Sequence, residues 1–380
     1  MKRQPGRARL LCYTFPTDSP LLGKVRRPMR RLAILAEGAF DPQHAKTAVG
    51  VLRYSEDMVV AIIDSTRAGQ DASVALGDPH GLGAGVPIVA DLPAALPFDP
   101  DTLLIGIAPI GGRLPDEWRG TILDAIAAGL TVVSGLHYFL ADDPEIADAA
   151  SARGVRIWDL RRPPDELAMR IGEGAAHRAG SHTVYFCGTD CNVGKMTVAV
   201  ECDREARRRG LSSVFAATGQ TGIMIAGRGI PADRFISDFL AGGVEGMTVP
   251  LCEVYDWVFV EGQGSLLHPA YSAVTLGLLH GSAPDLLILC HQAHRTHIRA
   301  YSVPIPPLSE VRAMYEQAAG WLKPAPVVAV ALNTYGLGDA EAREALSQAE
   351  NQTGLPATDP VRFGAGVLID ALLAHAAEVQ

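Results

Sequence analysis

The feature that most constrains the fold is a glycine-rich loop, Gly188–Thr197, between a predicted strand and a predicted helix. It reads Gly-Thr-Asp-Cys-Asn-Val-Gly-Lys-Met-Thr, with a β-branched and aromatic run at 183–187 before it and an amphipathic stretch at 194–209 after it. In this setting backbone amides at the helix N-terminus point at an anion, and Lys195 adds a mobile positive charge. An ordinary glycine turn is the alternative, but strand, two glycines, Gly-Lys and helix together predict a phosphate loop.

Two details separate this loop from the G-x-x-x-x-G-K-[ST] pattern. Five residues, not four, separate Gly188 from Gly194, and Met196 stands where a hydroxyl that holds Mg²⁺ usually follows the lysine. A thioether is a poor ligand for Mg²⁺, and Thr197 replaces the hydroxyl only if the helix start is shifted. We therefore expect phosphate binding at this loop but do not infer magnesium-dependent hydrolysis from it.

Short apolar runs alternate with helical patterns on both sides of a polar, small-residue connector near 161–180, which predicts two α/β units with parallel strands. The expected strands are 32–36, 58–64, 87–90, 102–107, 131–134 and 155–159, then 183–187, 213–217, 256–260, 285–290 and 326–332. The expected helices are 116–129 and 143–152, then 194–209, 233–241, 309–319, 339–350 and 364–377. We therefore expect a basic flexible leader at 1–30, a Rossmann-like domain at 31–170 and a P-loop NTPase-like domain with a mostly parallel sheet at 181–380.

Asp64 closes the second expected strand, where Rossmann domains often hold a ribose. The first turn, Glu37–Phe40, has no G-x-G-x-x-G, however. A plain Rossmann-like scaffold is therefore favoured over a dinucleotide site.

Charge is distributed unevenly along the chain. Nine of the 33 basic residues but one of the 42 acidic residues lie in 1–31, so the rest of the chain has a formal charge of −17. An acidic body argues against nucleic-acid binding. Without an apolar run of ~18 residues, a membrane helix is not expected. The six cysteines form no C-x-x-C, and with no export signal they indicate reduced thiols in the cytoplasm.

The longer phosphate loop resembles that of dethiobiotin synthetase, and four further segments allow a closer match. Ala217–Ile225 reads Ala-Thr-Gly-Gln-Thr-Gly-Ile-Met-Ile, and Val260–Tyr271 reads Val-Glu-Gly-Gln-Gly-Ser-Leu-Leu-His-Pro-Ala-Tyr. With Gly135-Leu-His137 and Asp159-Leu-Arg161 of the first domain, these segments resemble a bacterial and archaeal family long catalogued as a domain of unknown function. Its characterised members are D-glutamate N-acetyltransferases, and the resemblance covers about residues 31–375.

The resemblance implies acetyl-coenzyme A (acetyl-CoA) as donor and D-glutamate, or a similar acidic amino acid, as acceptor. Coenzyme A carries a pyrophosphate and a 3′-phosphate, so a phosphate loop can hold it without hydrolysing anything and without a metal. Asn333 ends the strand 326–332, where related P-loop proteins place an asparagine that reads adenine. The expected donor-binding residues are Gly188, Thr189, Asn192, Val193, Gly194, Lys195, Met196, Thr197 and Asn333.

Acetyl transfer to an amine needs a base for the ammonium and donors for the tetrahedral oxyanion. Glu261 follows the strand 256–260, at the edge where open α/β sheets bind ligands. His268 lies in the next loop, and an ordinary imidazole pKa near ~6.5 suits a base. Asp190 is a third candidate if it faces the amine or a backbone amide. We expect these three side chains to be catalytic, although a capping acid and a packed histidine are the alternatives.

A dicarboxylate acceptor needs cations, preferably arginines with their bidentate geometry. Arg295 and Arg299 follow the strand 285–290, and Arg113 follows two glycines of the first domain. Gln220 and Thr221 occupy a second loop at the same sheet edge. We expect these five residues to bind the acceptor, with solvated surface charges as the alternative for the arginines.

The histidines at 291, 294 and 297 suggest a metal by their spacing, but no carboxylate or cysteine accompanies them at a matching interval, so no metal site is expected. The leading hypothesis is a homo-oligomeric N-acetyltransferase that binds small molecules and neither nucleic acid nor membrane. Two alternatives stay open. One is an ATP-dependent ligase or kinase of the dethiobiotin-synthetase type, and the other is a non-catalytic nucleotide sensor.

Overall fold

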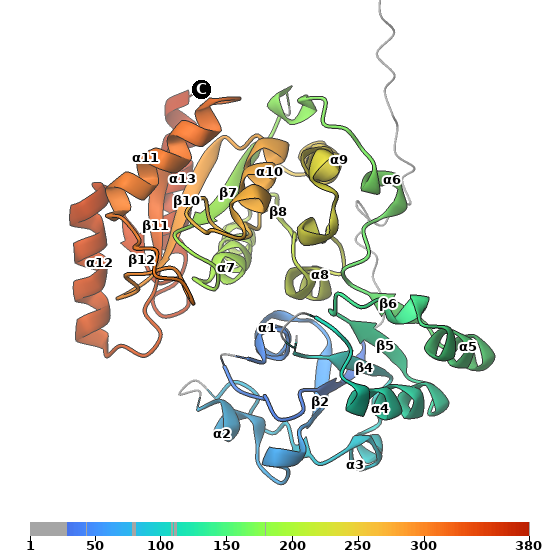
Figure 1. The fold of residues 1–380 in the computed structure, drawn as a ribbon. Coiled ribbons are helices and arrows are strands. Elements are labelled where there is room, and N and C mark those ends of the chain that lie inside the picture. The colour runs from blue at the N-terminus through green and yellow to red at the C-terminus, as the bar shows by residue number, and fades with distance from the viewer. Residues whose placement is uncertain are drawn as a thin grey trace, which may run out of the picture.

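The computed structural model describes residues 29–379 except 43, 78–80, 108, 110–111 and 179; the leader expected at 1–30 therefore lies almost wholly outside the described residues. Two α/β domains lie one above the other in Figure 1, joined by the chain from β6 through α6. Each domain contains a six-stranded sheet, and all strand pairings of both sheets are parallel. The expected fold class is confirmed.

The first sheet has the strand order β3-β2-β1-β4-β5-β6, which is that of a Rossmann fold. Its strands are β1 Arg31–Leu35, β2 Met58–Ile63, β3 Ile88–Val89, β4 Thr102–Ile105, β5 Thr131–Ser134 and β6 Ile157–Asp159. Its helices are α1 Lys46–Tyr54, α2 Ala72–Leu76, α3 Leu92–Ala95, α4 Asp116–Ala127 and α5 Pro144–Arg153, with α6 Asp165–Ala168 in the connector.

Asp64 is a structural residue of this first domain. Its fully buried carboxylate accepts hydrogen bonds from the amides of Gly38 and Phe40, both at 3.1 Å, and from the amide and hydroxyl of Thr66. These bonds hold the β1–α1 loop to the end of β2 and leave the carboxylate no room for a ribose. The plain scaffold reading of the first domain is therefore supported by the geometry.

The second sheet has the order β12-β11-β10-β7-β9-β8, so the strand that leads into the phosphate loop lies inside it. Its strands are β7 His182–Gly188, β8 Ser213–Ala216, β9 Trp257–Val260, β10 Leu286–Gln292, β11 Val327–Asn333 and β12 Ala357–Thr358. Its helices are α7 Lys195–Arg208, α8 Gln220–Ala226, α9 Ser237–Cys252, α10 Ser272–Ser282, α11 Leu308–Gly320, α12 Asp339–Thr353 and α13 Gly366–Val379. No helix among the described residues combines the length and apolarity that crossing a membrane requires.

Among the helices that were expected, α9 differs most from its expected bounds, because it begins after 233 and runs 11 residues past 241. It continues through Gly242, Gly243 and Gly246, which lie beyond the expected end at 241. A Cβ on Gly242 would lie 2.0 Å from the carbonyl oxygen of Arg170, so the glycines let the connector lie directly on the helix. Close packing therefore outweighs the helix propensity that each glycine costs.

The two domains meet through α1 and α8. The hydroxyls of Thr47 and Thr221 share a hydrogen bond of 2.8 Å across this contact. Gly50 of α1 allows the close approach, because a Cβ there would lie 2.7 Å from the Cγ2 of Thr221 and 3.5 Å from the Cε of Met196. One hydrophobic core cluster runs from the first sheet into the second domain. The interface is therefore packed as an interior.

The carboxyl ends of both sheets face this interface. Gly135, directly after β5, lies against Gln220, and a Cβ on the glycine would be 3.0 Å from the glutamine Cγ. The segment after β1 forms α1, and the segment after β8 forms α8. Because parallel sheets bind ligands at this edge, the ligand sites of both domains open toward one shared space.

Candidate functional site

The phosphate loop has the backbone that anion binding requires. Asn192 and Gly194 adopt positive φ angles of 59° and 107°, which turn successive amides of the loop inward. The loop is held from outside: the carbonyl of Gly188 accepts from the hydroxyl of Tyr315 at 2.8 Å, and the carbonyl of Thr189 accepts from the hydroxyl of Ser265 at 3.0 Å. The buried Thr189 hydroxyl lies 2.8 Å from the Nδ1 of His291, and this hydrogen bond also holds the loop in place.

Lys195 lies folded across its own loop. Its ammonium donates to the carbonyl oxygen of Asp190 at 2.7 Å, and its Cδ would be 3.1 Å from a Cβ at either Gly188 or Gly262. Burial lowers the pKa of this lysine, with nearby carboxyl and thiol groups acting against the shift. A charge desolvated in this way gains most when an anion enters the loop.

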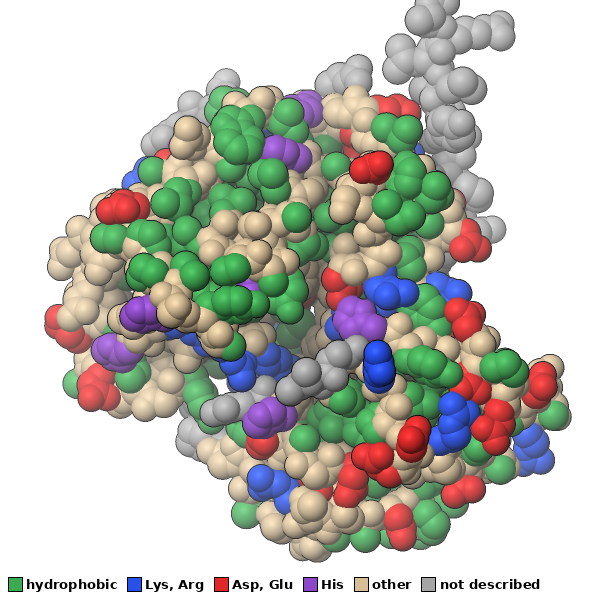
Figure 2. All heavy atoms as spheres, in the orientation of Figure 1, with side chains coloured by type: hydrophobic (Ala, Val, Ile, Leu, Met, Phe, Trp, Pro, Cys, Tyr) green, Lys and Arg blue, Asp and Glu red, His purple; other side chains and the backbone are tan. Residues whose placement is uncertain are grey.

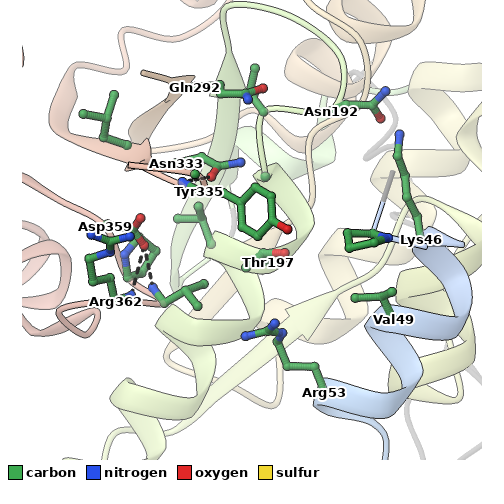
Figure 3. A pocket seen from close by; sticks show the side chains of 18 of the residues that line it. Lys46, Val49, Arg53, Asn192, Thr197, Gln292, Asn333, Tyr335, Asp359 and Arg362 are labelled. Carbon is green, nitrogen blue, oxygen red and sulfur yellow. Dashed lines mark hydrogen bonds between the residues drawn. The ribbon is translucent and has the colours of Figure 1, made fainter. Parts of the chain in front are cut away.

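A cavity of about 870 Å³ opens beside the loop, and its walls come from both domains (Figure 3). Five cationic side chains contribute to its lining, namely Lys46, Arg53, Arg295, Arg299 and Arg362. Asn192, Thr197 and Asn333 also line it, so donor-binding residues expected from different segments share one cavity. In Figure 3, Lys46 and Arg53 project from α1 on one side, opposite Asn333, Tyr335 and Arg362. This cavity is shaped and charged for a large polyanion.

Lys46 is the basic residue that the first domain contributes next to the loop. Its pKa falls from an ordinary 10.5 to about 8, first because the surrounding protein partly desolvates the ammonium and then because of the charge of Arg299, with Arg295 and Lys195 adding to the effect. Mutually repelling cations in a partly dry space favour an anionic ligand that neutralises them. Sequence reasoning missed this residue.

Asn333 stands at the end of β11 as expected, and its Oδ1 accepts from the amide of Tyr335 at 3.0 Å. The exposed Tyr335 ring lines the same cavity. Among the described residues the NH₂ of Asn333 has no hydrogen-bond partner, and the Tyr335 ring lines the cavity with it. An adenine is a chemically suitable occupant of this end of the cavity.

Glu261 is buried at the end of β9. One carboxylate oxygen accepts from the amides of Thr218 at 2.8 Å and Gly219 at 3.2 Å, and the other accepts from the side-chain amide of Gln263 at 3.0 Å. Burial raises the pKa of Glu261 to about 7, against the effect of these hydrogen bonds and of Lys195. A carboxylate that titrates near neutrality has the proton affinity of a general base.

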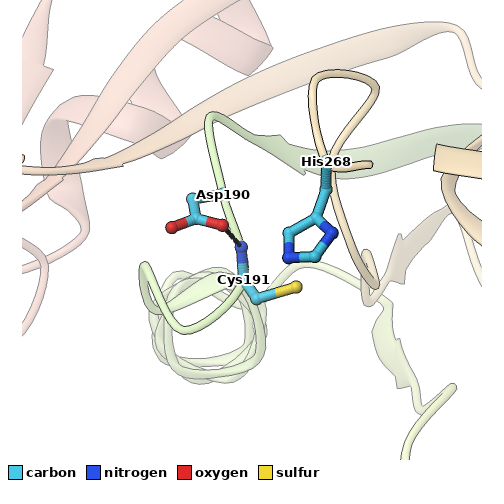
Figure 4. Close-up of side chains that lie close together, drawn as sticks. All are labelled: Asp190, Cys191 and His268. Atoms are coloured by element: carbon cyan, nitrogen blue, oxygen red, sulfur yellow. Dashed lines mark hydrogen bonds between the residues drawn. The ribbon is translucent and has the colours of Figure 1, made fainter. Parts of the chain in front are cut away.

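His268 lies over the phosphate loop, with its ring directed at Asp190 and Cys191 (Figure 4). One ligand atom from each of these three residues lies within 4.8 Å of the others. The Nδ1 of His268 accepts from the amide of Ala270 at 3.1 Å, so the neutral ring carries its hydrogen on Nε2. Burial lowers the pKa of His268, which keeps the ring neutral. In this tautomer the histidine is a hydrogen-bond donor to the site rather than a base.

Asp190 is fully buried and its oxygens are engaged. One oxygen accepts from a guanidinium NH of Arg295 and from the amide of Arg299, both at 2.8 Å, and the other from the amide of Cys191 at 2.6 Å. Asp190 thus ties the segment after β10 to the phosphate loop. The arrangement leaves this carboxylate little capacity for a further ligand such as a metal ion.

Other predicted site residues are placed apart from one another. Thr221 bonds across the domain interface, and Met196 packs toward Gly50, which gives the residue after the lysine a packing role. Arg113 is exposed in the first domain. The three histidines after β10 do not gather; among the described residues, the one group with metal-ligand spacing is the Asp190–Cys191–His268 group.

The structure adds four residues that sequence reasoning left out of the site, namely Lys46, Arg53, Tyr335 and Arg362. Two of them lie on α1, seven residues apart and so two turns along one face of the helix. This spacing is visible in the sequence, but it indicates a shared face only if residues 46–54 are assigned to a helix. Tyr335 and Arg362 lie in loops after β11 and β12, where spacing carries no such signal.

The site and fold define a two-domain protein in which a phosphate loop faces a Rossmann-like domain across a cationic cavity. Family models match both parts: a Rossmann-like domain of unknown function, DUF1611_N, at residues 65–163, and a P-loop domain of unknown function, DUF1611_C, at residues 170–369. The chain belongs to the DUF1611 family.

Relatives of this chain extend over most of its length. A protein of Tritonibacter scottomollicae named D-glutamate N-acetyltransferase is 44% identical over 277 residues, 72% of this chain and 81% of that protein. A protein of the same name from a Pseudoalteromonas species is 34% identical over 72% of this chain and 80% of its own. A crystal structure of a DUF1611 family protein from Anabaena variabilis is 43% identical, with a TM-score of 0.85, and the match covers 91% of this chain and 99% of that one.

Proposed function

We propose that this protein is an N-acetyltransferase that moves the acetyl group of acetyl-CoA to the amine of D-glutamate. The observation that carries the proposal is the 44% identity, over most of both chains, with a protein named D-glutamate N-acetyltransferase. The shared two-domain architecture supports extending that activity to this chain. The chemistry of the interdomain cavity supports the choice of donor.

Coenzyme A matches the cavity by charge and by composition. Its pyrophosphate suits the phosphate loop with Lys195, and its 3′-phosphate suits the arginines and Lys46 that line the remaining wall. Asn333 and Tyr335 stand where an adenine can be read and stacked. We assign Arg295 and Arg299 to this donor side, because both line the cavity beside Asn192.

The reaction itself needs two functions from the protein, a base and a donor for the oxyanion. The acceptor ammonium gives a proton to a base, its nitrogen attacks the thioester carbonyl, and the C–S bond breaks as the C–N bond forms. The leaving thiolate then takes the second proton of the attacking nitrogen, so the products are the amide and the free thiol. Glu261, with its pKa of about 7, is our candidate for the base, and the Nε2–H of His268 is our candidate donor for the developing oxyanion.

The direct test incubates the protein with acetyl-CoA and a panel of D- and L-amino acids and detects free thiol. We expect thiol release with D-glutamate that is faster than with the L-isomer. ATP turnover in place of thiol release would favour a ligase or kinase instead. Nucleotide binding without any turnover would favour a sensor.

A further inference from the structure

A second group of polar side chains, two arginines among them, lies between the domains, away from the cavity beside the phosphate loop. His137 follows β5 and Arg161 follows β6, both from the first domain, while Asp233 and Arg234 belong to a short 3₁₀ helix, Ala232–Arg234, of the second. Figure 2 shows Lys, Arg and His side chains around the hollow between the two domains. The proposed donor site leaves these residues without a role.

Arg161 is built into this interface in a fixed orientation. Its side chain is 8% exposed, its Nε donates to the carbonyl of Gly135 at 2.6 Å, and its Nη1 donates to the carboxylate of Asp233. Its Nη2 has no hydrogen-bond partner among the described residues. A buried guanidinium aligned on one side keeps its other edge for a further acceptor.

The positive charges of this group exceed the negative ones. Among the described residues, Asp233 is the one carboxylate within ion-pair distance of Arg161 or of His137, whose Nε2 lies 3.8 Å away. Among the described residues, the exposed Arg234 forms no ion pair. Its guanidinium lies 4.6 Å from the ring centre of Phe139. Burial and the charge of Arg234 lower the pKa of Arg161 to about 10, so these guanidiniums are close enough to repel. Such a group favours an added anion.

The group adjoins the proposed reaction centre through short contacts. Gly135, which Arg161 holds, lies against Gln220, and a Cβ on Gly219 would be 2.6 Å from the Nε2 of Gln263. Gln263 in turn bonds to Glu261. An acceptor with its carboxylates on the arginines would therefore extend toward the proposed base.

We propose that Arg161, Arg234 and His137 bind the carboxylates of the acidic acceptor, so that the acceptor subsite lies between the domains, with Arg161 and His137 supplied by the first domain and Arg234 by the second. The inference rests on the proposed function and adds the residues that recognise the second carboxylate of the substrate. Arg113 follows Gly112, whose carbonyl accepts from the amide of His137 at 2.9 Å, so this predicted substrate residue lies at the edge of the same group. Paired guanidiniums select a carboxylate over an amide, and hence glutamate over glutamine.

The test uses Arg234→Gln, because Arg234 is exposed and its loss leaves the buried Arg161–Asp233 pair intact. Arg162→Gln is the matched control: its guanidinium lies 4.4 Å from the same Phe139 ring but pairs with Asp142 at 2.6 Å. Binding is measured by calorimetry with glutarate, a dicarboxylate that has no amine. Activity is measured with D-glutamate and D-glutamine.

We expect Arg234→Gln to weaken glutarate binding roughly tenfold or more and to reduce the preference for D-glutamate over D-glutamine by a similar factor, with acetyl-CoA affinity unchanged. Arg162→Gln should resemble the parent protein in each measurement. The assignment is overturned if the parent protein shows no detectable glutarate binding, or if both variants bind glutarate with equal affinity. Arginine-dependent glutarate binding without any acetyl transfer would instead contradict the proposed function and leave an acidic-ligand site standing.

Discussion

The ammonium of Lys195 donates a hydrogen bond of 2.7 Å to the backbone carbonyl of Asp190, five residues before it in the same loop. The lysine side chain therefore lies across the loop that an anion would enter. A phosphate must replace this carbonyl as the acceptor, and the charge-assisted contact that it offers is the stronger one. The buried Lys195 ammonium is therefore positioned to bind a phosphate before the ligand arrives.

Lys195→Ala should weaken coenzyme A binding, because it deletes a contact to phosphate worth roughly 1.5–3 kcal/mol. Calorimetry with coenzyme A measures the change, and Lys323→Ala, on the far side of the domain and paired with Asp285, is a control. Equal affinity in the two variants would show that the loop binds something else.

Coenzyme A binding should take up protons near pH 8.5 because of Lys46. In the free protein its pKa is about 8, against an ordinary 10.5, so the side chain is mostly neutral at that pH. A phosphate beside it raises the pKa again, and affinity should fall as pH rises through 8. Calorimetry in buffers of different ionisation enthalpy measures the uptake.

Lys46→Met should remove most of that proton uptake and flatten the pH dependence. The effect of pH on folding stability is opposite to its effect on coenzyme A affinity. Because the pKa of Lys46 is lowered in the folded protein, the unfolded chain binds more protons between pH 8 and 10.5. The contribution of Lys46 to stability therefore rises with pH in that range. Uptake that persists in the variant would assign the proton to another group.

Glu261→Gln should lower kcat by about 10²–10⁴-fold while acetyl-CoA affinity changes little. The base must be ionised, so the activity of the parent should rise with pH to a plateau above about 7, and the variant should lose this acidic limb. Glutamine keeps an acceptor for the Thr218 and Gly219 amides, so the turn that Glu261 holds should survive.

His268→Asn is the companion variant for the same pH profile. It removes the Nε2 donor without removing the proposed base, so kcat should fall while the acidic limb stays. If Glu261→Gln and His268→Asn both keep near-normal kcat, the loop after β9 is scaffold. The base would then have to be sought in the first domain.

Gly50→Ala should impair activity through the domain contact, because the new Cβ would lie 2.7 Å from the Cγ2 of Thr221. Gly120→Ala in α4 is the matched control, since nothing lies within 4 Å of a Cβ there. The control should gain roughly 0.5–1 kcal/mol from helix propensity. A similar gain at Gly50, with full activity, would show that the α1–α8 contact yields easily.

Chelation by EDTA should leave acetyl transfer intact. The Asp190–Cys191–His268 group has metal-ligand spacing, but Asp190 is already held by Arg295 and by two backbone amides. Activity lost to EDTA and restored by Mg²⁺ or Zn²⁺ would revive a metal-dependent reaction.

Sequence periodicity predicted the strands better than the helices. Six helices were missed. Three of them, α2, α3 and α6, have only four or five residues. The other three, α1, α8 and α10, have no side-chain cap bond at the N-terminus, where Ala45, Gly219 and Tyr271 stand. Without a Ser, Asp or Asn start signal, short segments rich in glycine and apolar residues look like loops. Strand β12 has two residues and pairs with β11 at the edge of the sheet. Two residues are too few to show the alternation that indicates a strand.

The candidate site was predictable only where one segment carries the chemistry. The loop at 188–197 identifies itself, and Glu261 follows from its place after a strand. The tautomer of His268 depends on the amide of Ala270, and the pKa of Lys46 depends on Arg299, 253 residues away in the chain. Both are products of tertiary contact and leave no local pattern.

The most direct measurement follows an isotopically labelled acetyl group from acetyl-CoA into product. The protein is incubated with labelled donor and D-glutamate, and free thiol and N-acetylglutamate are quantified by mass spectrometry. We predict labelled N-acetyl-D-glutamate and thiol in equal amounts, with the rate at subsaturating donor strongly reduced in Lys195→Ala. No labelled product, or label appearing only as free acetate, would contradict the assignment of this protein as an acetyltransferase for D-glutamate.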